Sequence, residues 1–330
     1  MRAVDIHAHV VLEETFGAAG AHGPTLTEEA GGPVFRIGNY CLRGVRYRGS
    51  PFMEPEKRLA AMDAARIGVQ VLSPNPLTYL HHIGSRDAIA FCRRHNDALA
   101  RLVSAHATRL LAFAALPMQD VSAALDELDR ARELGLLAGY IGTEFGTLLD
   151  SPALDRFYAG CVQRDVPLFL HPAPAGIDGP PGDPRLTRFD LDLVIGFAAE
   201  ETLTVATLIY GGVLDRHPEL DVCVSHGGGA APYLAGRMAA AARKRAWAPA
   251  TIRPDGAFEE RLARLWYDVH VHDERALGLL RSVVGDQRLV YGTNFAGWDQ
   301  AEPQPLGALG ETLTRNAARL LRRPALVEPA

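Results

Sequence analysis

Lysine is nearly absent from this chain of 330 residues, because Lys57 and Lys244 are the only two. Both lie in charged, helix-like segments, so Schiff-base chemistry on a lysine amine is not expected. The four cysteines are far apart and show no Cys-x-x-Cys spacing, which is typical of reduced thiols in the cytoplasm. The formal net charge is only -5 and no block of like charges occurs, which argues against nucleic acid or an anionic membrane as a partner.

Signals of several other protein classes are missing too. The sequence has no Gly-x-Ser-x-Gly nucleophile elbow, no Gly-x-x-x-x-Gly-Lys phosphate loop and no Gly-x-Gly-x-x-Gly fingerprint. A strand-like run begins at Ala3, which leaves no room for a signal peptide, and no apolar run approaches the length that spans a membrane. We therefore expect a cytoplasmic protein that acts on a small molecule.

What the sequence does contain is a regular alternation of short β-rich runs and longer amphipathic segments. The predicted strands are 3–9, 69–73, 110–116, 139–143, 167–171, 221–226, 265–271 and 289–294. The predicted helices are 55–67, 86–105, 121–134, 151–163, 191–216, 232–245, 273–284 and 306–321. Eight such repeats favour a (β/α)8 TIM barrel, with an open doubly wound sheet as the alternative fold.

The domain organisation follows from this alternation. Barrels of this kind routinely use ~250 residues as one unit, so we expect a single barrel domain over residues 1–330. Residues 12–51 do not fit the alternation, and they follow the first predicted strand. Because loops after barrel strands lie at the C-terminal mouth, we expect 12–51 to be an insertion that acts as a lid over this mouth.

Histidines end several of the predicted strands, and this is the most informative pattern in the chain. His7 and His9 are two residues apart in the first strand, so their side chains project to the same face. His171 ends the fifth strand and His226 ends the sixth. Because the C-terminal ends of barrel strands converge, these rings are expected to gather around a divalent metal. The alternative is that they are hydrogen-bonded core histidines.

Two further features lie at the same ends of strands. His270 ends the seventh predicted strand, and we expect it to contact the pocket. Three glycines follow His226, at positions 227–229, and Pro232 comes soon after. We expect these glycines to let the backbone approach the metal before a helix begins at Pro232.

Several motifs, taken together, resemble the amidohydrolase superfamily, and within it the branch typified by aminocarboxymuconate semialdehyde decarboxylase. The motifs are Asp5-Ile6-His7-Ala8-His9, Arg58-Leu59-Ala60-Ala61-Met62-Asp63, Val69-Gln70-Val71-Leu72-Ser73, Pro167-Leu168-Phe169-Leu170-His171-Pro172, Gly211-Gly212-Val213-Leu214-Asp215-Arg216-His217-Pro218, Ser225-His226-Gly227-Gly228-Gly229 and Pro232-Tyr233-Leu234-Ala235-Gly236-Arg237. The match covers nearly the whole chain.

The resemblance implies a mononuclear zinc bound by His7, His9 and His171, with manganese and iron as alternative metals. It implies that His226 is the general base beside a metal-activated water. It also implies a homodimer in which Arg43 and Arg237 bind the substrate carboxylate, Arg237 reaching the site of the partner subunit.

The chain departs from this family at the eighth strand, where Asn294 stands in Tyr291-Gly292-Thr293-Asn294 at the position of a metal-binding, proton-accepting aspartate. An asparagine amide can bind a metal through its oxygen but cannot take up a proton near neutral pH. The metal would then keep more positive charge, which weakens its retention. Proton transfer would fall to His226, helped by His270, Glu144 or Asp299. Asp299 lies five residues further on, which argues against a direct exchange of roles.

We therefore predict a metal-dependent decarboxylase, a carboxy-lyase of a small unsaturated or aromatic carboxylic acid. A hydrolase or hydratase is the alternative within the same superfamily, because activated water serves all three reactions. The second alternative is a non-catalytic barrel that has lost a metal ligand at Asn294.

Overall fold

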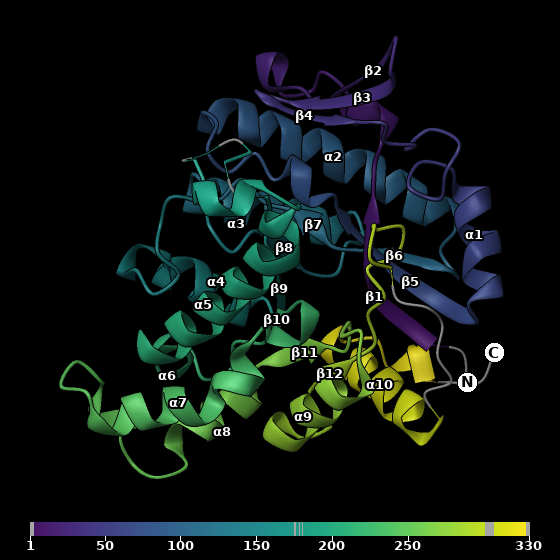
Figure 1. Ribbon diagram of the computed structural model, residues 1–330. Coiled ribbons are helices and arrows are strands. Elements are labelled where there is room, and N and C mark those ends of the chain that lie inside the picture. The colour runs from purple at the N-terminus through teal and green to yellow at the C-terminus, as the bar shows by residue number, and fades with distance from the viewer. Residues whose placement is uncertain (1–2, 175, 178, 180, 301–306, 328–330) are drawn as a thin grey trace.

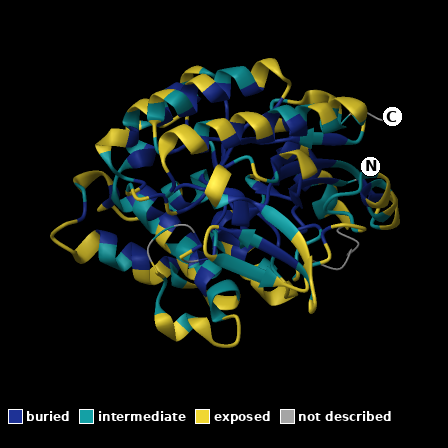
Figure 2. Ribbon diagram, turned by 90° about the horizontal axis from the view of Figure 1, so that it is seen from above, coloured by how far each residue is buried: buried dark blue, intermediate teal, exposed yellow. Residues whose placement is uncertain are grey.

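The computed structural model describes residues 3–174, 176–177, 179, 181–300 and 307–327. The ends of the predicted domain, 1–2 and 328–330, and the first residue of the predicted last helix, 306, lie outside these ranges. Its centre is a parallel barrel with helices around it (Figure 1). The helices expose their outer faces, and the barrel strands are mostly buried (Figure 2).

The barrel strands occur where the apolar runs predict them. They are β1 (Ala3–Val10), β5 (Ile67–Pro74), β6 (Leu110–Ala112) with its continuation β7 (Ala114–Ala115), β8 (Gly139–Ile141), β9 (Leu168–Leu170), β10 (Val222–Val224), β11 (Trp266–Asp268) and β12 (Leu289–Val290). The order is β1-β5-β6 in one sheet and β12-β11-β10-β9-β8-β7 in the other. A hydrogen bond from Phe113 N to Leu72 O (2.9 Å) and another from Ile6 N to Tyr291 O (3.0 Å) close the ring. The predicted TIM barrel is confirmed.

The helices pack on the outside of the barrel (Figure 1). They are α1 (Pro55–Ala64), α2 (Ser85–Ala105), α3 (Val121–Glu133), α4 (Asp155–Gln163), α5 (Phe197–Tyr210), α6 (Val213–Arg216), α7 (Ala231–Lys244), α8 (Ala257–Arg264), α9 (Glu274–Val284) and α10 (Gly307–Leu320). Side-chain caps begin some of them, as where Asp120 accepts from the backbone N–H groups of Ser122 and Ala123 at the start of α3.

Two expectations about the segment after the fifth barrel strand were wrong. The predicted helix 191–216 is three pieces: a π-helical turn (Asp192–Gly196), α5 and α6. The chain breaks at Gly212, whose φ of 70° is left-handed backbone that favours glycine. In addition, Asp192–Tyr210 forms a continuous helical stretch of 19 residues with a mean hydropathy of 1.5, so one helix in the described part of the chain does reach membrane-spanning length and composition.

Residues 12–51 contain a small antiparallel sheet of β2 (Thr25–Glu29), β3 (Gly32–Ile37) and β4 (Tyr40–Arg43). Figure 1 shows this sheet at one end of the molecule, beyond α2. Its buried side chains Phe35 and Ile37 belong to the same cluster as Leu80, in the loop after β5, and Phe91 of α2. The sheet thus packs on a loop at the C-terminal side of the barrel, while its function as a lid stays a prediction.

Aromatic rings fill the barrel interior beneath this end. Phe113, Tyr140 and Phe169 are buried and stacked, with ring centroids 5.2 Å apart for Tyr140 and Phe169 and 5.6 Å apart for Phe113 and Phe169. Tyr140 also stacks on His171 at 6.1 Å. These tightly packed apolar rings support His171 from inside the barrel.

Candidate metal centre and active site

Three histidine rings converge inside the barrel, each with its Nδ1 occupied by an acceptor. His7 and His9 lie in β1, and His171 directly follows β9. The Nδ1 of His7 lies 2.7 Å from Asp268 Oδ2, and that of His171 lies 2.6 Å from Pro172 O. Because a carboxylate and a carbonyl only accept, both rings donate from Nδ1 and leave Nε2 without a hydrogen.

The same assignment holds for His9. Its Nδ1 lies 3.1 Å from Ser73 Oγ and 3.3 Å from Pro74 O. The Ser73 hydroxyl donates its own hydrogen to Ala8 O at 3.1 Å, so it accepts from His9. All three histidines therefore present a bare Nε2.

These bare nitrogens fit a divalent metal ion. His7 Nε2 and His9 Nε2 face each other at 3.3 Å, and two lone pairs at that distance repel unless a cation lies between them. Two nitrogens bound to one zinc at 2.0–2.1 Å with a tetrahedral angle would be ~3.3 Å apart. Among the described residues, buried His171 Nε2 has no hydrogen-bond partner, which suits a nitrogen that binds a metal.

Burial keeps these three rings neutral. It lowers the pKa of His9 to about 3, and it holds the pKa values of His7 and His171 well below their usual range. Neighbouring histidines lower them further. A neutral imidazole is the form that binds a metal, so the surroundings favour binding near neutral pH.

His226 follows β10 beside the three rings, with centroids 5.0 Å from those of both His7 and His171. Its Nδ1 lies 2.5 Å from Oε1 of Glu201, which is fully buried and also accepts from Ser225 Oγ. Burial alone would lower the pKa of His226, but the Glu201 carboxylate outweighs it and raises the pKa to about 9. The result is a histidine–carboxylate pair that can hold and transfer a proton.

The glycines after His226 allow the turn that they form to pack closely against its neighbours. Gly228 and Gly229 have φ of 74° and 63°. A Cβ on Gly229 would lie 2.1 Å from Ala198 O of α5, and one on Gly228 would lie 2.7 Å from the Tyr267 ring. The glycines therefore let this turn pack against α5 and β11, while their expected role in bringing the backbone close to a metal stays a prediction.

Two more residues singled out from the sequence join the cluster. The His270 ring centroid lies 5.2 Å from that of His226 and 5.7 Å from that of His7. Asn294 is 6% exposed and donates from Nδ2 to Asp299 Oδ1 at 2.6 Å. Asp299 Oδ2 lies 3.2 Å from His270 Nε2. Asp299 thus lies at the site despite its distance along the chain from the expected position.

The structure does not bring Arg43, Arg237 or Glu144 into this cluster. Arg43 Nη1 is 2.9 Å from Glu29 Oε2 on the outer sheet, and its side chain is 64% exposed. Arg237 is exposed on α7. Glu144 pairs with His82 at 2.7 Å, and its side chain is 56% exposed. Within one subunit these groups are thus solvent-facing, and a carboxylate-binding role for either arginine is not tested by this arrangement.

Sequence reasoning missed three residues that hold the histidines in place: Asp268, Glu201 and Ser73. Asp268 had a readable signal, because it stands two residues before His270 and so on the same strand face. Ser73 had a weaker signal, since it is only the last residue of the second predicted strand, 69–73. Glu201 lies in the middle of a helical segment, where a glutamate carries no local sign of such a role.

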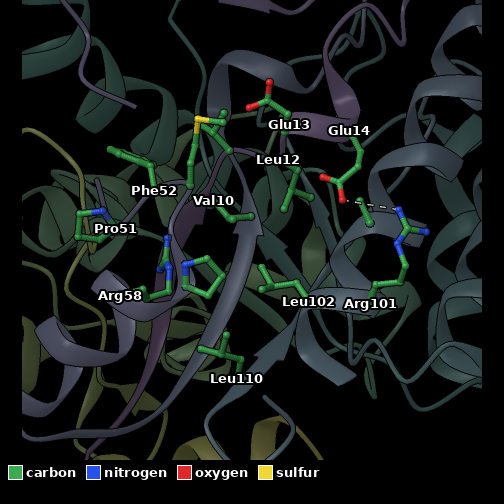
Figure 3. A pocket seen from close by; sticks show the side chains of 14 residues that line it. Val10, Leu12, Glu13, Glu14, Pro51, Phe52, Arg58, Arg101, Leu102 and Leu110 are labelled. Carbon is green, nitrogen blue, oxygen red and sulfur yellow. Dashed lines mark ion pairs between the residues drawn. The ribbon is translucent and has the colours of Figure 1, made fainter. Parts of the chain in front are cut away.

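A separate cavity of about 210 Å³ lies between the end of β1, α1 and α2. Figure 3 shows its lining, which includes Val10, Arg58, Leu102 and an ion pair between Glu14 and Arg101. None of the described lining residues is a histidine. We therefore assign the chemistry to the histidine cluster rather than to this cavity.

A closed barrel with histidines converging at the carboxyl ends of its strands is the architecture of a metal-dependent enzyme. The family model described as Amidohydrolase matches residues 4–323, so the chain belongs to the amidohydrolase family.

Named relatives of this chain are decarboxylases. It is 29% identical to the 2-amino-3-carboxymuconate-6-semialdehyde decarboxylase of Dictyostelium discoideum, over 93% of this chain and 83% of that one. It is 32% identical to the gamma-resorcylate decarboxylase of Rhizobium sp. (strain MTP-10005), over 69% of each chain. The fold matches that of a dihydroxybenzoic acid decarboxylase from Polaromonas sp. JS666, solved with manganese and the inhibitor 2-nitroresorcinol, with a TM-score of 0.74, 21% identity and 97% of each chain covered.

Proposed function

We propose that this protein is a metal-dependent decarboxylase of a small aromatic or unsaturated carboxylic acid. The observation that carries the proposal is the convergence of three bare imidazole nitrogens, of His7, His9 and His171, beside the His226–Glu201 pair. The relatives named above act on acids of this kind, which favours decarboxylation over hydrolysis or hydration.

Decarboxylation requires a residue near the metal that can deliver a proton to the substrate carbon. The bond between a carbon and its carboxylate breaks, the electron pair stays on that carbon, and a proton must arrive there as CO2 leaves. A divalent metal, when bound, supplies a Lewis acid that polarises a substrate oxygen or activates water. His226, anchored by Glu201, is the group best situated to carry the proton, and His270 borders the same space.

The metal is proposed to be zinc, with manganese or iron as alternatives. Three neutral imidazoles suit zinc, and they also suit other divalent transition metals. The manganese in the Polaromonas neighbour supports a divalent ion in this fold without selecting zinc for this chain. Reconstitution of metal-free protein with each ion in turn, followed by turnover, separates these metals.

A homodimer is proposed through the surface of α5 and α7. Large apolar side chains are exposed on these helices and on the π-helical turn before α5, with Val194 and Ile195 of the turn at 52%, Leu203 of α5 at 59% and Tyr233 of α7 at 79%. Such a patch on a soluble barrel suits an interface with another copy, and it accounts for the apolar character of Asp192–Tyr210. Arg237 lies one turn after Tyr233 on α7, so the same interface would carry it toward a partner's substrate.

Two further expectations remain part of the proposal. The sheet of β2, β3 and β4 is proposed to act as a lid, and Arg43 at its end is proposed to meet the substrate carboxylate when the lid closes. A cytoplasmic location is proposed because the four cysteines are free, three of them buried.

The direct test is release of CO2 from muconate-like and hydroxybenzoate-like acids by the metal-loaded protein. We expect turnover of at least one of these acids and a loss of about 10²-fold or more for His226→Ala. Product analysis distinguishes CO2 release from hydration or hydrolysis. Equal turnover by the wild type and His226→Ala would remove His226 from the chemistry, and a product that retains the carboxylate would exclude decarboxylation.

A further inference from the structure

The turn after β12 folds a carboxylate back into the metal centre. Asn294 has a φ of 48°, and the backbone N–H of Gly297 donates to Asn294 O at 2.8 Å. The Gln300 side chain accepts from Ala296 N at 2.8 Å and closes the turn. As a result Asp299, five residues after Asn294, lies directly against its amide, with Oδ1 2.6 Å from Nδ2.

This contact settles which way the Asn294 amide points. A carboxylate only accepts, so the amide nitrogen faces Asp299 and the amide oxygen faces away from it. That oxygen, Oδ1, is buried and has no hydrogen-bond partner in the part of the chain that is described. A buried carbonyl oxygen without a donor is costly, and a cation is a partner that fits it.

Asp299 also touches the histidines of the site. Its Oδ2 lies 3.2 Å from His270 Nε2, and its side chain is only 15% exposed. Potential ligand atoms of His226, His270 and Asp299 all lie within 4.8 Å of one another. The carboxylate therefore lies beside His226 and His270, whose ring centroids are 5.0 and 5.7 Å from that of His7, so its charge would act on an ion at His7 with little screening.

Gly297 is needed for this arrangement. A Cβ at this position would lie 2.8 Å from Asn294 Cγ and Nδ2, closer than real Cβ atoms approach. The turn therefore has room for the Asn294–Asp299 contact because position 297 has no side chain.

We propose that Asp299 replaces the carboxylate that the eighth strand lacks. It positions the Asn294 amide so that the oxygen is free for the metal, and it returns one negative charge to the centre. The sequence argued against an exchange of roles because the two positions are five residues apart, but the turn removes that separation. The inference rests on the proposed metal-dependent function and deepens it.

The test is the affinity of the whole protein for a divalent ion, measured with zinc and with cobalt by competition against a chromophoric chelator. Asp299→Asn keeps the side-chain volume and removes the charge, and we expect 10–100-fold weaker binding. Adding Asn294→Asp to this variant returns the charge to the eighth strand, and we expect the affinity to recover to within a few-fold of wild type. The absorption bands of bound cobalt should shift in Asp299→Asn and return in the double variant.

Asp255→Asn is the matched control, because its side chain is 96% exposed and it removes the same charge far from the site. Its affinity should equal that of wild type. If wild type binds zinc and Asp299→Asn binds it equally tightly, the role of Asp299 is refuted while the metal-dependent function stands. If Asn294→Asp fails to rescue Asp299→Asn, the exchange of roles is refuted. If the wild-type protein binds no divalent ion, both the proposed metal-dependent function and the role of Asp299 are refuted.

Discussion

Replacing Asp268 by asparagine should weaken metal binding, because Asp268 accepts a hydrogen bond from His7 Nδ1 and so orients the ring that presents Nε2 to the metal. Asp268 is fully buried at the end of β11, and both of its oxygens accept hydrogen bonds. Oδ2 accepts from His7 Nδ1 at 2.7 Å, and Oδ1 accepts from the backbone N–H of His270 at 3.0 Å. A carboxamide offers only one acceptor oxygen, so one of these two donors must lose its partner in Asp268→Asn.

The magnitude follows from these two bonds. If the amide nitrogen turns toward His7, the ring must accept at Nδ1 and carry its proton on Nε2, the atom that should bind the metal. If it turns toward His270, a buried N–H is orphaned, at a cost of about 1–3 kcal/mol. Loss of such an outer partner typically weakens metal affinity 10–100-fold, which corresponds to about 1.4–2.7 kcal/mol.

The assay is chelator competition for zinc at pH 7, with circular dichroism to verify folding. Asp221→Asn is the control, because Asp221 also pairs with buried and half-buried groups, Trp266 and Arg288, but stands before β10 at the opposite end of the barrel. It should leave the zinc affinity unchanged. Wild-type affinity in a folded Asp268→Asn protein would refute the reasoning that His7 is a ligand oriented by this carboxylate.

Three further predictions concern catalysis, pH and assembly. Glu201→Gln should lower kcat about 10²-fold while the metal content stays at wild-type level, because the Glu201 carboxylate anchors His226. Glu200→Gln, at the neighbouring position, is the control. An unchanged kcat for Glu201→Gln would contradict a catalytic role for the Glu201–His226 pair. Burial lowers the pKa of His95 to about 4, so the unfolded chain binds a proton that the folded one does not, and stability falls as the pH drops from about 6.5 to about 4. His95→Leu should reduce this slope by about 1.4 kcal/mol per pH unit, measured by urea unfolding, and an unchanged slope would contradict it. Tyr233→Glu should convert the proposed dimer to monomer in sedimentation velocity, and a dimer that persists in this variant would exclude the α5–α7 interface.

The barrel could be predicted because it depends on local pattern. Buried parallel strands are short, continuous apolar runs, and each of the predicted ones has a counterpart in the structure. Where the pattern is weaker the prediction failed: the sheet of β2, β3 and β4 and helix α8 were not foreseen, and the break at Gly212 was read as continuous helix. Glycine inside a helical pattern is ambiguous until the tertiary structure decides.

The candidate site divides in the same way. His7, His9, His171 and His226 could be placed together from the sequence because His9, His171 and His226 end predicted strands, His7 shares a strand face with His9, and strand ends converge. The residues that orient these histidines could not be predicted from the sequence. Contacts such as that between Glu201 and His226 join separate segments of the chain, and Glu201 stands in no recognisable motif. The separation of five residues between Asn294 and Asp299 argues from sequence against an exchange of roles, but a tight turn brings the two side chains into contact.

The most direct measurement is metal analysis of the purified protein combined with anomalous diffraction at the absorption edge of the metal found. The account predicts one equivalent of a divalent transition metal and a single anomalous peak at bonding distance from the Nε2 atoms of His7, His9 and His171. Protein that takes up no such metal on titration, or a peak away from these three rings, would contradict it.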